Sequence, residues 1–470
     1  MAVRARGNFI KLNLTGVKAL GIIVATSALI VATAARAQSQ NPPANAQGQT
    51  PPPATAPAQA APAPTARIAD IKVNGSHKHS AAELAYASGL KVDQVVTREQ
   101  LQAAATKLVN SGLVTNVNYK FTTDTVGVHI VFNVQDADAV PVLFDNFPWF
   151  SDAELGAVLQ QAVGVFDGVA PPQGDVLDKM TGALQDLLFS RGVHGRVEHM
   201  LLERPDGPGQ IMQFTVTGIA VKVAGVTFTD PLAMKSLEVS ARLVDAVGQH
   251  YSRLTMITFD FEQVRPTYLT NGYLNVMFGT PTAVLTGETT PAGDKTVRVT
   301  VPITPGVQYH LAAIEWSGNT ALTSANLTAM IAIAPGALAD GNKIQGAIQS
   351  IDQHYAHIGY LDAQVEPTAQ FDDANAKVSY QMKVTEGPQF RMGNLVITGL
   401  SLDAEKKLRA AWTLAQGTAF DQDYFDNFVS KMAKPTTEVF GNIPVHYEKI
   451  GDLLRRNEEN HTVDVLLDFQ

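Results

Sequence analysis

The chain has no cysteine, which excludes disulfides, thiolate metal ligands and a lipid-modified N-terminal cysteine. Aromatic residues make up only 7% and charged residues 17% of the 470 residues. The sequence also lacks a G-x-S-x-G elbow and an H-E-x-x-H helix, two patterns typical of hydrolases. We therefore expect a protein that is not an enzyme, with no catalytic residues, no metal site and no cofactor.

Basic residues are few, and part of them lies in one N-terminal segment. The chain has 35 Lys and Arg residues against 44 Asp and Glu, and five of the 35 lie in residues 1–37. The remaining 30 basic residues leave the rest of the chain with a formal charge of −14. Because such a chain repels phosphate backbones, we expect that nucleic acid is not a partner.

Residues 1–37 are typical of an export signal. Arg4, Arg6, Lys11 and Lys18 precede an uncharged run from 19 to 35, and Ala35-Arg36-Ala37 forms an A-x-A processing site. We expect cleavage after Ala37, and an inner-membrane anchor is the alternative if the segment is retained. Residues 38–66 follow as an uncharged stretch rich in Pro, Ala and Gln, which predicts a disordered tether.

Five glycines recur at nearly constant spacing after position 66. Gly112, Gly192, Gly272, Gly359 and Gly441 are 80, 80, 87 and 82 residues apart. Each stands where a helical pattern gives way to a strand pattern, as expected of a helix-ending glycine. A period of this length indicates a row of similar small domains.

The first unit sets the order of elements as β-α-α-β-β. An alternating strand at 68–73 is followed by capping boxes at Ser80/Glu83 and Thr97/Gln100, which predict two helices. Two more alternating strands complete the unit. The fold class is therefore α+β, as a tandem array of five units that each have a three-stranded sheet with two helices on one face, at 67–137, 138–218, 219–305, 306–388 and 389–470.

The fourth unit carries the clearest family resemblance. Its first strand runs into Trp316-Ser317-Gly318-Asn319, its long helix ends at Ile358-Gly359-Tyr360, and its last strand ends at Val384-Thr385-Glu386-Gly387. This pattern resembles the POTRA (polypeptide-transport-associated) domain. Five such units after a secretion signal resemble the periplasmic part of the outer-membrane barrel-assembly protein family.

The resemblance implies a non-enzymatic binding module in the periplasm, peripheral to the outer membrane. Family members that insert barrels have a C-terminal transmembrane barrel, whereas residues 389–470 are here assigned to the fifth unit. We therefore expect the array to hold unfolded outer-membrane polypeptides, or to dock assembly partners, beside a barrel supplied by another chain. A structural spacer or scaffold in an envelope complex is the alternative.

The strand order of the family places the middle strand of each unit at a sheet edge, where an extended client can pair by β-augmentation. We expect such client-binding edges in the first, third and fourth units. The residues are Val117, Asn118, Tyr119, Lys120 and Phe121; Leu274, Asn275, Val276, Met277 and Phe278; and Ala363, Gln364, Val365 and Glu366. Of the first set, Val117, Tyr119 and Phe121 are expected to point inward.

Several other patterns are interpreted as structural. The pairs His77/His79 and His354/His357 lack the third ligand that zinc requires. Gly336-x-x-x-x-Gly341-Asn342-Lys343 departs from a phosphate loop at Asn342 and is interpreted as an interhelical loop. We expect exposed charges at Asp260, Glu262, Asp372 and Asp373, and a hydrophobic staple at Phe147, Trp149 and Phe150, with an exposed client-binding patch as the alternative for that cluster.

Overall fold

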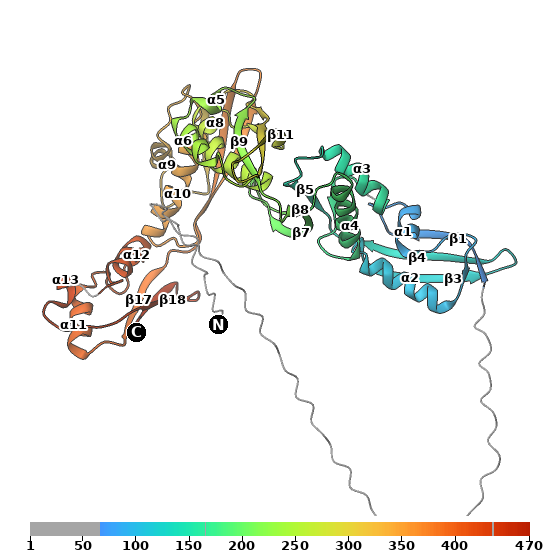
Figure 1. The fold of residues 1–470 in the computed structure, drawn as a ribbon. Coiled ribbons are helices and arrows are strands. Elements are labelled where there is room, and N and C mark those ends of the chain that lie inside the picture. The colour runs from blue at the N-terminus through green and yellow to red at the C-terminus, as the bar shows by residue number, and fades with distance from the viewer. Residues whose placement is uncertain (1–65, 165, 435–436) are drawn as a thin grey trace, which may run out of the picture. The chain divides into compact units, whose positions relative to one another are not determined.

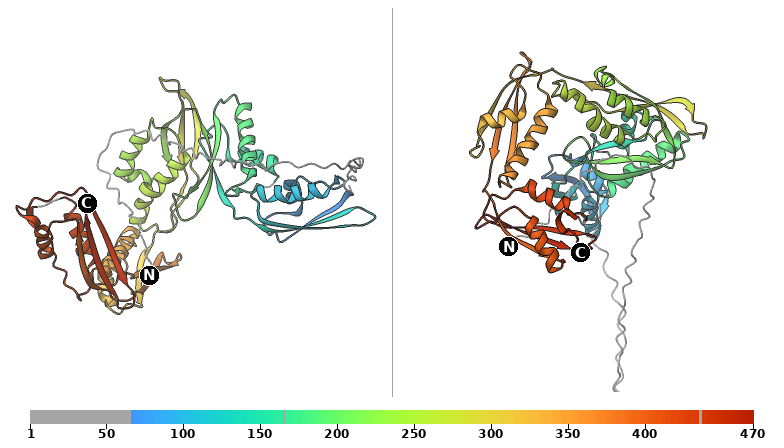
Figure 2. Two further views of the ribbon diagram at one scale, coloured as in Figure 1. Left: turned by 90° about the horizontal axis from the view of Figure 1, so that it is seen from below. Right: turned by 90° about the vertical axis from the view of Figure 1, so that its left-hand side faces the viewer.

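The computed structural model describes residues 66–164, 166–434 and 437–470. The predicted signal peptide and nearly all of the predicted tether lie outside these residues, and Ala66 already begins the first strand. The described chain is a row of small α+β modules in which helices cover one face of each sheet (Figures 1 and 2). No helix among the described residues is long and apolar enough to cross a membrane.

Modules 1 and 2 follow the expected order of elements with one short strand added between the two helices. Module 1 consists of β1 (Ala66–Asn74), α1 (Ala81–Ser88), β2 (Val95–Val96), α2 (Arg98–Asn110), β3 (Val114–Thr123) and β4 (Val128–Asp136). Module 2 consists of β5 (Val140–Asp145), α3 (Asp152–Val163), β6 (Val169–Ala170), α4 (Asp175–Ser190), β7 (Arg196–Glu203) and β8 (Gln210–Thr217).

Modules 4 and 5 repeat the expected order of elements, with no short strand between the first two helices of either module in the described chain. Module 4 consists of β14 (His310–Ser317), α9 (Ser324–Ile331), α10 (Gly341–His357), β15 (Gln364–Asp372) and β16 (Lys377–Thr385). Module 5 consists of β17 (Arg391–Thr398), α11 (Leu402–Ala411), α12 (Gln422–Lys431), α13 (Thr437–Phe440), β18 (Ile450–Asn457) and β19 (Thr462–Phe469).

Module 3 departs most from the expected template. Its second helix is continuous but changes winding, because a π-helical turn lies between two α-helical parts. The elements are β9 (Val221–Phe228), α5 (Leu232–Lys235), α6 (Leu237–Ala246), α7 (Arg253–Phe259), η1 (Asp260–Val264), α8 (Arg265–Thr270), β10 (Met277–Phe278), β11 (Thr282–Thr289), β12 (Lys295–Val301) and β13 (Ile303–Thr304).

The sheets share one topology. In every module the last long strand lies in the centre, parallel to the first strand and antiparallel to the middle one. The orders are β2-β1-β4-β3, β6-β5-β8-β7, β11-β12-β9, β14-β16-β15 and β17-β19-β18. The middle strand of the sequence therefore forms an edge in each sheet, as expected.

Each module has its own hydrophobic core. In module 4 the core joins Ile351 and Tyr355 of α10 to Leu311 of β14 and to Val378 and Met382 of β16, all at most 1% exposed. Burial of one such side chain stabilises a fold by about 1.5–3 kcal/mol. The long helix thus binds the first and last strands together, which lie far apart in the sequence.

The local sequence signals act as predicted at the helix ends. The capping boxes at Ser80/Glu83, Thr97/Gln100 and Ser151/Glu154 are all formed. The five periodic glycines all have positive φ, between 62° and 93°. Phe150, before the Ser151 cap, is buried with Leu155 four positions after the cap, which confirms the staple.

An acidic residue after the last strand fixes the turn that follows the first strand. In module 4, Glu386 accepts hydrogen bonds from the Thr320 and Ala321 N–H groups at 2.7 and 2.8 Å and from the Tyr355 hydroxyl at 3.0 Å. Burial raises the pKa of Glu386, but these bonds outweigh it and the pKa lies below its ordinary value. In module 1, Asp136 likewise accepts from the His77 and Lys78 N–H groups.

The same turn needs a left-handed residue that lies close to the last strand. Gly318 has φ of 79°, and a Cβ built there would lie 2.1 Å from the Val384 carbonyl oxygen. Gly75 and Gly399 occupy equivalent places against Val134 and Phe469, at 2.3 and 1.8 Å. No side chain fits at these positions without movement of the central strand.

We expect Gly318→Ala to destabilise module 4 by at least about 2 kcal/mol, because the left-handed backbone and the contact with Val384 both oppose a Cβ. Gly346→Ala is the matched control, since Gly346 lies in α10 with no atom within 4 Å of a built Cβ. It should stabilise the helix by about 0.5–1 kcal/mol. Hydrogen exchange of the β16 amides in the whole chain measures both effects, and equal protection in the two variants would contradict this account.

Candidate functional site

The start of the first strand in each sheet is covered by the chain's own interhelical segment. In module 4, the Leu311 N–H donates to the Ala337 carbonyl at 2.8 Å, and the Gly336 N–H donates to the Leu311 carbonyl at 2.7 Å. Module 3 repeats this pair of bonds with Val223 and residues 248–249, and module 5 repeats it with Met392 and residues 417–418. In modules 1 and 2, β2 and β6 cover the corresponding edge.

The covering segment always contains a residue with positive φ at a similar spacing. These residues are Asp93, Gly168, Gly248, Gly336 and Gly417, with φ of 68°, 98°, 83°, 85° and 84°. Gly336 therefore belongs to an interhelical segment that pairs with β14, which confirms the interpretation of the glycine-containing loop before Lys343. In the sheets that the structure describes, the middle strand has no strand paired to its outer side. The start of the first strand, in contrast, is paired with the interhelical segment.

The open edge of module 1 is β3, as expected. Val117 and Tyr119 contact the core, and the Tyr119 hydroxyl donates to Gln102 Oε1 at 3.2 Å. Asn118 and Lys120 are exposed. Phe121 lies opposite the buried Ile130 and so on the inward face, as expected, but it is 43% exposed because it lies beyond the packed core.

The open edge of module 4 is β15, which contains three of the four expected residues. Gln364 is exposed, Val365 is 8% exposed, and Glu366 pairs with Lys383 on β16 at 3.3 Å. Ala363 precedes the strand and packs against the core. Pro367 follows within the strand and supplies no N–H for pairing.

The prediction that residues 274–278 form the open edge strand of module 3 is wrong. Leu274, Asn275 and Val276 lie outside any strand, and Met277 with Phe278 forms the short β10, which pairs with β13 in a separate sheet. Leu274 instead packs into the core of module 4, and Asn275 Nδ2 donates to the Tyr309 hydroxyl at 3.2 Å. This segment connects two modules, so it is used for packing between them.

The true open edge of module 3 is β11. Ala283 and Leu285 contact the core while Val284 is 66% exposed, an alternation that the sequence shows as Thr-Ala-Val-Leu-Thr. The signal was obscured because Gly279 and Pro281 precede the strand and Gly287 interrupts it. A register shift between Leu285 and Thr289 leaves Thr282–Leu285 as the regular part.

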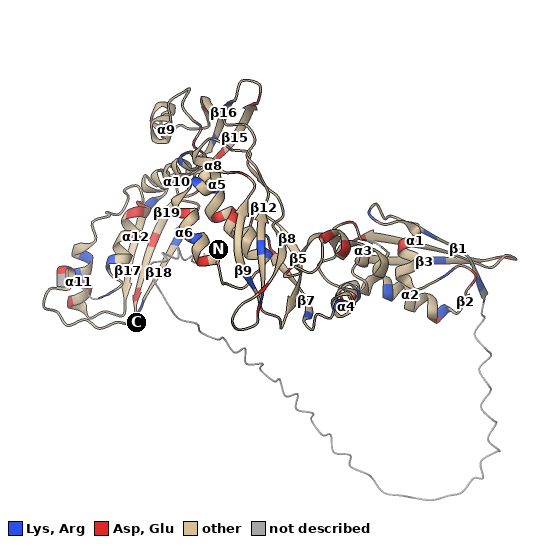
Figure 3. Ribbon diagram, turned by 45° about the horizontal axis from the view of Figure 1, so that its top comes forward, with Lys and Arg blue, Asp and Glu red and all other residues tan. Residues whose placement is uncertain are grey.

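The edges differ in the features that block pairing. Charged side chains and proline are common protections of an open edge. Such residues are Lys120 in β3, Glu366 and Pro367 in β15, and Asp452, Arg455 and Arg456 in β18. The β11 edge has no proline, and its only charged residue is Glu288, outside the regular part. Figure 3 marks the charged residues of the described chain along the ribbon.

The joints that follow modules 3 and 4 are built alike. The Gly272 carbonyl accepts from the Tyr309 N–H at 2.8 Å, and the Gly359 carbonyl accepts from the Phe390 N–H at 2.8 Å. Asn342, which breaks the phosphate-loop pattern, donates through Nδ2 to the Pro266 carbonyl at 2.8 Å. The joint after module 4 also contains His357, whose Nδ1 lies 2.9 Å from Asp421 Oδ1.

The joint between modules 2 and 3 depends on buried polar groups. Asp145, 4% exposed, accepts hydrogen bonds from Gln213 at 2.8 Å, from the Ser252 hydroxyl at 3.0 Å and from the Arg253 N–H. The Arg253 guanidinium pairs with Asp152 at 2.8 Å. Burial raises the pKa of Asp145 despite these bonds.

The aromatic cluster before α3 is mostly internal. Phe147 is 3% and Phe150 7% exposed, and Trp149 contacts the cores of both module 2 and module 3. The hypothesis of an exposed client-binding patch is therefore wrong for Phe147 and Phe150.

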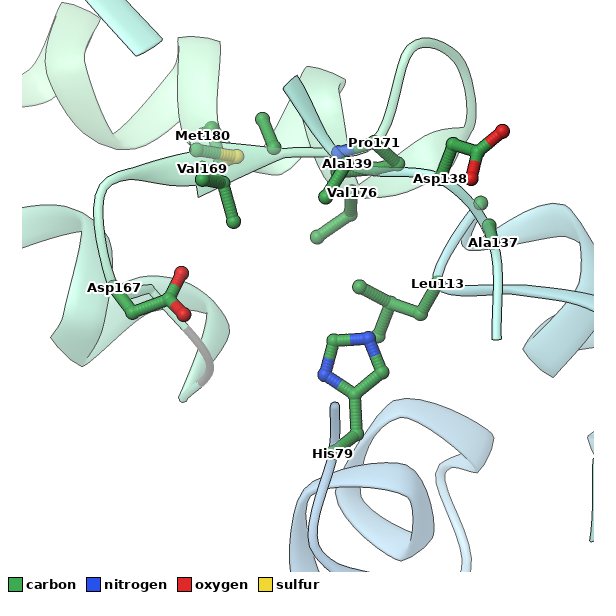
Figure 4. A pocket seen from close by; sticks show the side chains of 12 residues that line it. His79, Leu113, Ala137, Asp138, Ala139, Asp167, Val169, Pro171, Val176 and Met180 are labelled. Carbon is green, nitrogen blue, oxygen red and sulfur yellow. The ribbon is translucent and has the colours of Figure 1, made fainter. Parts of the chain in front are cut away.

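The His79 imidazole faces a small cavity at the joint of modules 1 and 2, as Figure 4 shows. The cavity has a volume of about 30 Å³, which is enough for about one water. Within the described residues no group of three His, Asp or Glu side chains is placed to hold a metal ion. We assign no binding role to this cavity.

The four acids expected to be exposed do not behave alike. Asp372 and Asp373 accept hydrogen bonds near the β15–β16 turn, from Asn375 and from the Tyr309 hydroxyl. Asp260 is 2% exposed and neither carboxyl oxygen has a hydrogen-bond partner, so the expectation for it is wrong. Burial raises the pKa of Asp260 to about 8.

The chain is an array that contains POTRA domains. The model of the POTRA family, described as surface antigen variable number repeat, matches residues 66–137 and 309–387, which contain modules 1 and 4. The sheet order and the covered first strand recur in the other modules.

One known protein is similar in sequence to part of this chain. The chain is 25% identical over 234 residues to a protein of Treponema pallidum (strain Nichols) named as an outer membrane protein assembly factor, a match that covers 47% of this chain and 27% of the relative. The chain thus spans about a quarter of that relative's length.

Two solved structures show weaker likeness. POTRA3-5 of Haemophilus influenzae BamA matches with a TM-score of 0.38 at 20% identity, covering 53% of this chain and 96% of that one. POTRA1-3 of the periplasmic domain of Omp85 from Anabaena matches with a TM-score of 0.17 at 12% identity, covering 69% and 97%. With TM-scores below 0.5, these likenesses carry no argument about this chain.

The buried Asp260 predicts a pH-dependent stability. Its carboxyl stays protonated in the folded chain up to about pH 8 but ionises near pH 4 when unfolded, so the folded state loses stability as pH rises through this window. The loss is about 1.4 kcal/mol per pH unit. Asp260→Asn should therefore raise the melting temperature increasingly from pH 4 to 8, with a constant difference above pH 8, in calorimetry of the whole chain. Asp245→Asn, an exposed acid on α6, is the control, and a pH-independent effect of Asp260→Asn would refute the assignment.

Proposed function

We propose that this chain is a non-enzymatic periplasmic binding module that holds extended segments of outer-membrane polypeptides and so supports outer-membrane protein assembly. Clients are bound by β-augmentation, as an added strand on an open sheet edge. The observation that carries the proposal is that the middle strand is an edge of each sheet, whereas the start of the first strand is paired with the interhelical segment. Partners are unfolded outer-membrane segments and a separate barrel protein or assembly subunit.

The match of two segments to the POTRA model and the similarity to a named outer membrane protein assembly factor both support this role. These similarities support a role in outer-membrane protein assembly and a location in the envelope, while the sheet edges suggest β-augmentation as the mechanism. Backbone pairing is independent of client sequence, which suits a protein that serves many clients.

We place the binding edges on β3, β11 and β15. The regular part of β11, Thr282–Leu285, has the fewest obstacles, since it carries neither charge nor proline. On β3, residues Val117, Asn118, Tyr119, Lys120 and Phe121 offer a longer edge that carries one lysine. On β15, residues Gln364, Val365 and Glu366 precede Pro367, which limits the edge that a client can use.

A structural spacer is a second candidate function. The repeated hydrogen bonds at the joints after modules 3 and 4 favour it, because a spacer needs defined connections between its units. An inner-membrane-anchored form of either function applies if residues 1–37 are retained.

Cysteine cross-linking tests the edges directly, since the chain has no native cysteine. We expect Val284→Cys and Lys120→Cys to form disulfides with a ten-residue outer-membrane strand peptide that carries one cysteine. Arg242→Cys, on exposed α6, is the control and should react at least about tenfold less. The same peptide with alternate N-methylated amides cannot extend a sheet and should lose the preference.

Proline substitution separates the edge from a spacer role. Backbone N–H groups alternate in direction, so one of the neighbouring variants Ala283→Pro and Val284→Pro removes the free N–H and the other removes a bond to β12. We expect the proline variant that removes the free N–H to weaken peptide binding with the fold intact, and Val284→Ala to have little effect. Equal cross-linking of the peptide to all cysteine variants, together with unchanged peptide affinity in the folded proline variants, would refute the edge mechanism and favour the spacer role.

A further inference from the structure

The π-helical turn η1 holds a carboxyl group that has no partner. The Arg265 N–H donates to the Asp260 carbonyl, so the backbone bond spans five residues instead of four. Asp260 is 2% exposed, and both of its side-chain oxygens lack a hydrogen-bond partner. A buried carboxyl without a partner costs several kcal/mol, and π-turns inside helices are frequent at functional sites.

A cavity of about 270 Å³ adjoins this turn. Asp260 lines it together with Ile257, Phe261, Val276 and Phe278. Sites for whole small-molecule ligands usually measure about 300–1,000 Å³. This cavity is therefore suited to a single side chain, and its lining combines apolar and aromatic residues with Asp206, Asp260, Arg265 and Thr280.

Two other charged residues line the cavity beside Asp260. Arg265 also lines it, and its guanidinium lies 5.1 Å from the centre of the Phe261 ring, so the aromatic wall is already occupied by a cation from this chain. Asp206, which lines the cavity as well, is paired with Arg204 at 2.8 Å. The carboxyl of Asp260 is thus the unsatisfied polar group at this cavity, and the net negative charge beyond residue 37 attracts cationic segments.

We propose that this cavity binds an arginine side chain of a partner polypeptide, whose guanidinium pairs with the Asp260 carboxylate and whose aliphatic stem contacts Ile257, Val276 and Phe278. A guanidinium can donate two parallel hydrogen bonds to one carboxylate, which would satisfy both of its free oxygens. The proton that Asp260 holds in the unbound protein passes to solvent when the guanidinium binds. This site recognises a side chain, whereas edge pairing recognises backbone, so the two can be tested separately.

The test compares two probes that differ only in charge. Nα-acetyl-arginine methylamide and its citrulline analogue have nearly the same shape, but only the first carries a guanidinium. Saturation-transfer NMR with the whole chain measures their dissociation constants. We expect millimolar binding of the arginine probe and at least about tenfold weaker binding of the citrulline probe, a ratio that corresponds to about 1.4 kcal/mol.

Three variants locate the binding. Asp260→Asn keeps the shape of the side chain and removes the charge, so it should abolish the preference for arginine. Thr280→Trp, at the exposed mouth of the cavity, leaves Asp260 in place and should block both probes. Asp245→Asn, on exposed α6, should leave both constants unchanged.

Circular dichroism confirms that each variant is folded. Equal affinity for the two probes, a preference that persists in Asp260→Asn, or no binding of the arginine probe at millimolar concentration would each overturn the proposal. None of these outcomes would affect the cross-linking test of the sheet edges.

Discussion

The pairing of the first strand with the interhelical segment is the interaction on which the properties of each module depend. It satisfies backbone groups of a strand that would otherwise be open, as the Gly336–Leu311 bond shows in module 4. A residue with positive φ is needed there because the chain must turn between the end of one helix and the start of the next while it follows the strand. The opposite edge of each sheet is the middle strand, which has no strand paired to its outer side within the described residues.

The modules share this construction but differ in how they use polar groups. The half-buried Glu386 fixes a turn through the Thr320 and Ala321 N–H groups, and the buried Asp145 fixes a joint through Ser252 and Arg253. Asp260 lacks any such partner. The contrast matters because buried carboxyl groups are normally satisfied, so an unsatisfied one next to a cavity points to a group that this chain does not supply.

Module 3 combines both kinds of candidate site. It carries the β11 edge, whose regular part Thr282–Leu285 has no charged residue, and the unsatisfied Asp260 in η1. The same module departs most from the shared pattern, with five helical segments and a second, two-stranded sheet. Local departures from a regular fold are commonly found at functional sites.

Much of the fold followed from the sequence because its signals are local. Capping boxes, helix-ending glycines and alternating strands depend on neighbouring residues, so the order β-α-α-β-β and the long helices could be predicted from them. The edge positions of β3 and β15 were implied by the resemblance to the POTRA family. The position of β11 was obscured by Gly279 and Pro281, which made the preceding Leu274–Phe278 the stronger strand pattern. The burial of Asp260 could not be predicted at all, because an α-helix and a π-turn present that residue on different faces and the difference arises only when the helix packs on its sheet. The sequence by itself determined the repeat, the helix ends and the order of helices and strands along the chain, since each depends on residues that are close in the chain. Only the tertiary structure decided which edge is open and which carboxyl lacks a partner, because both depend on what distant segments cover.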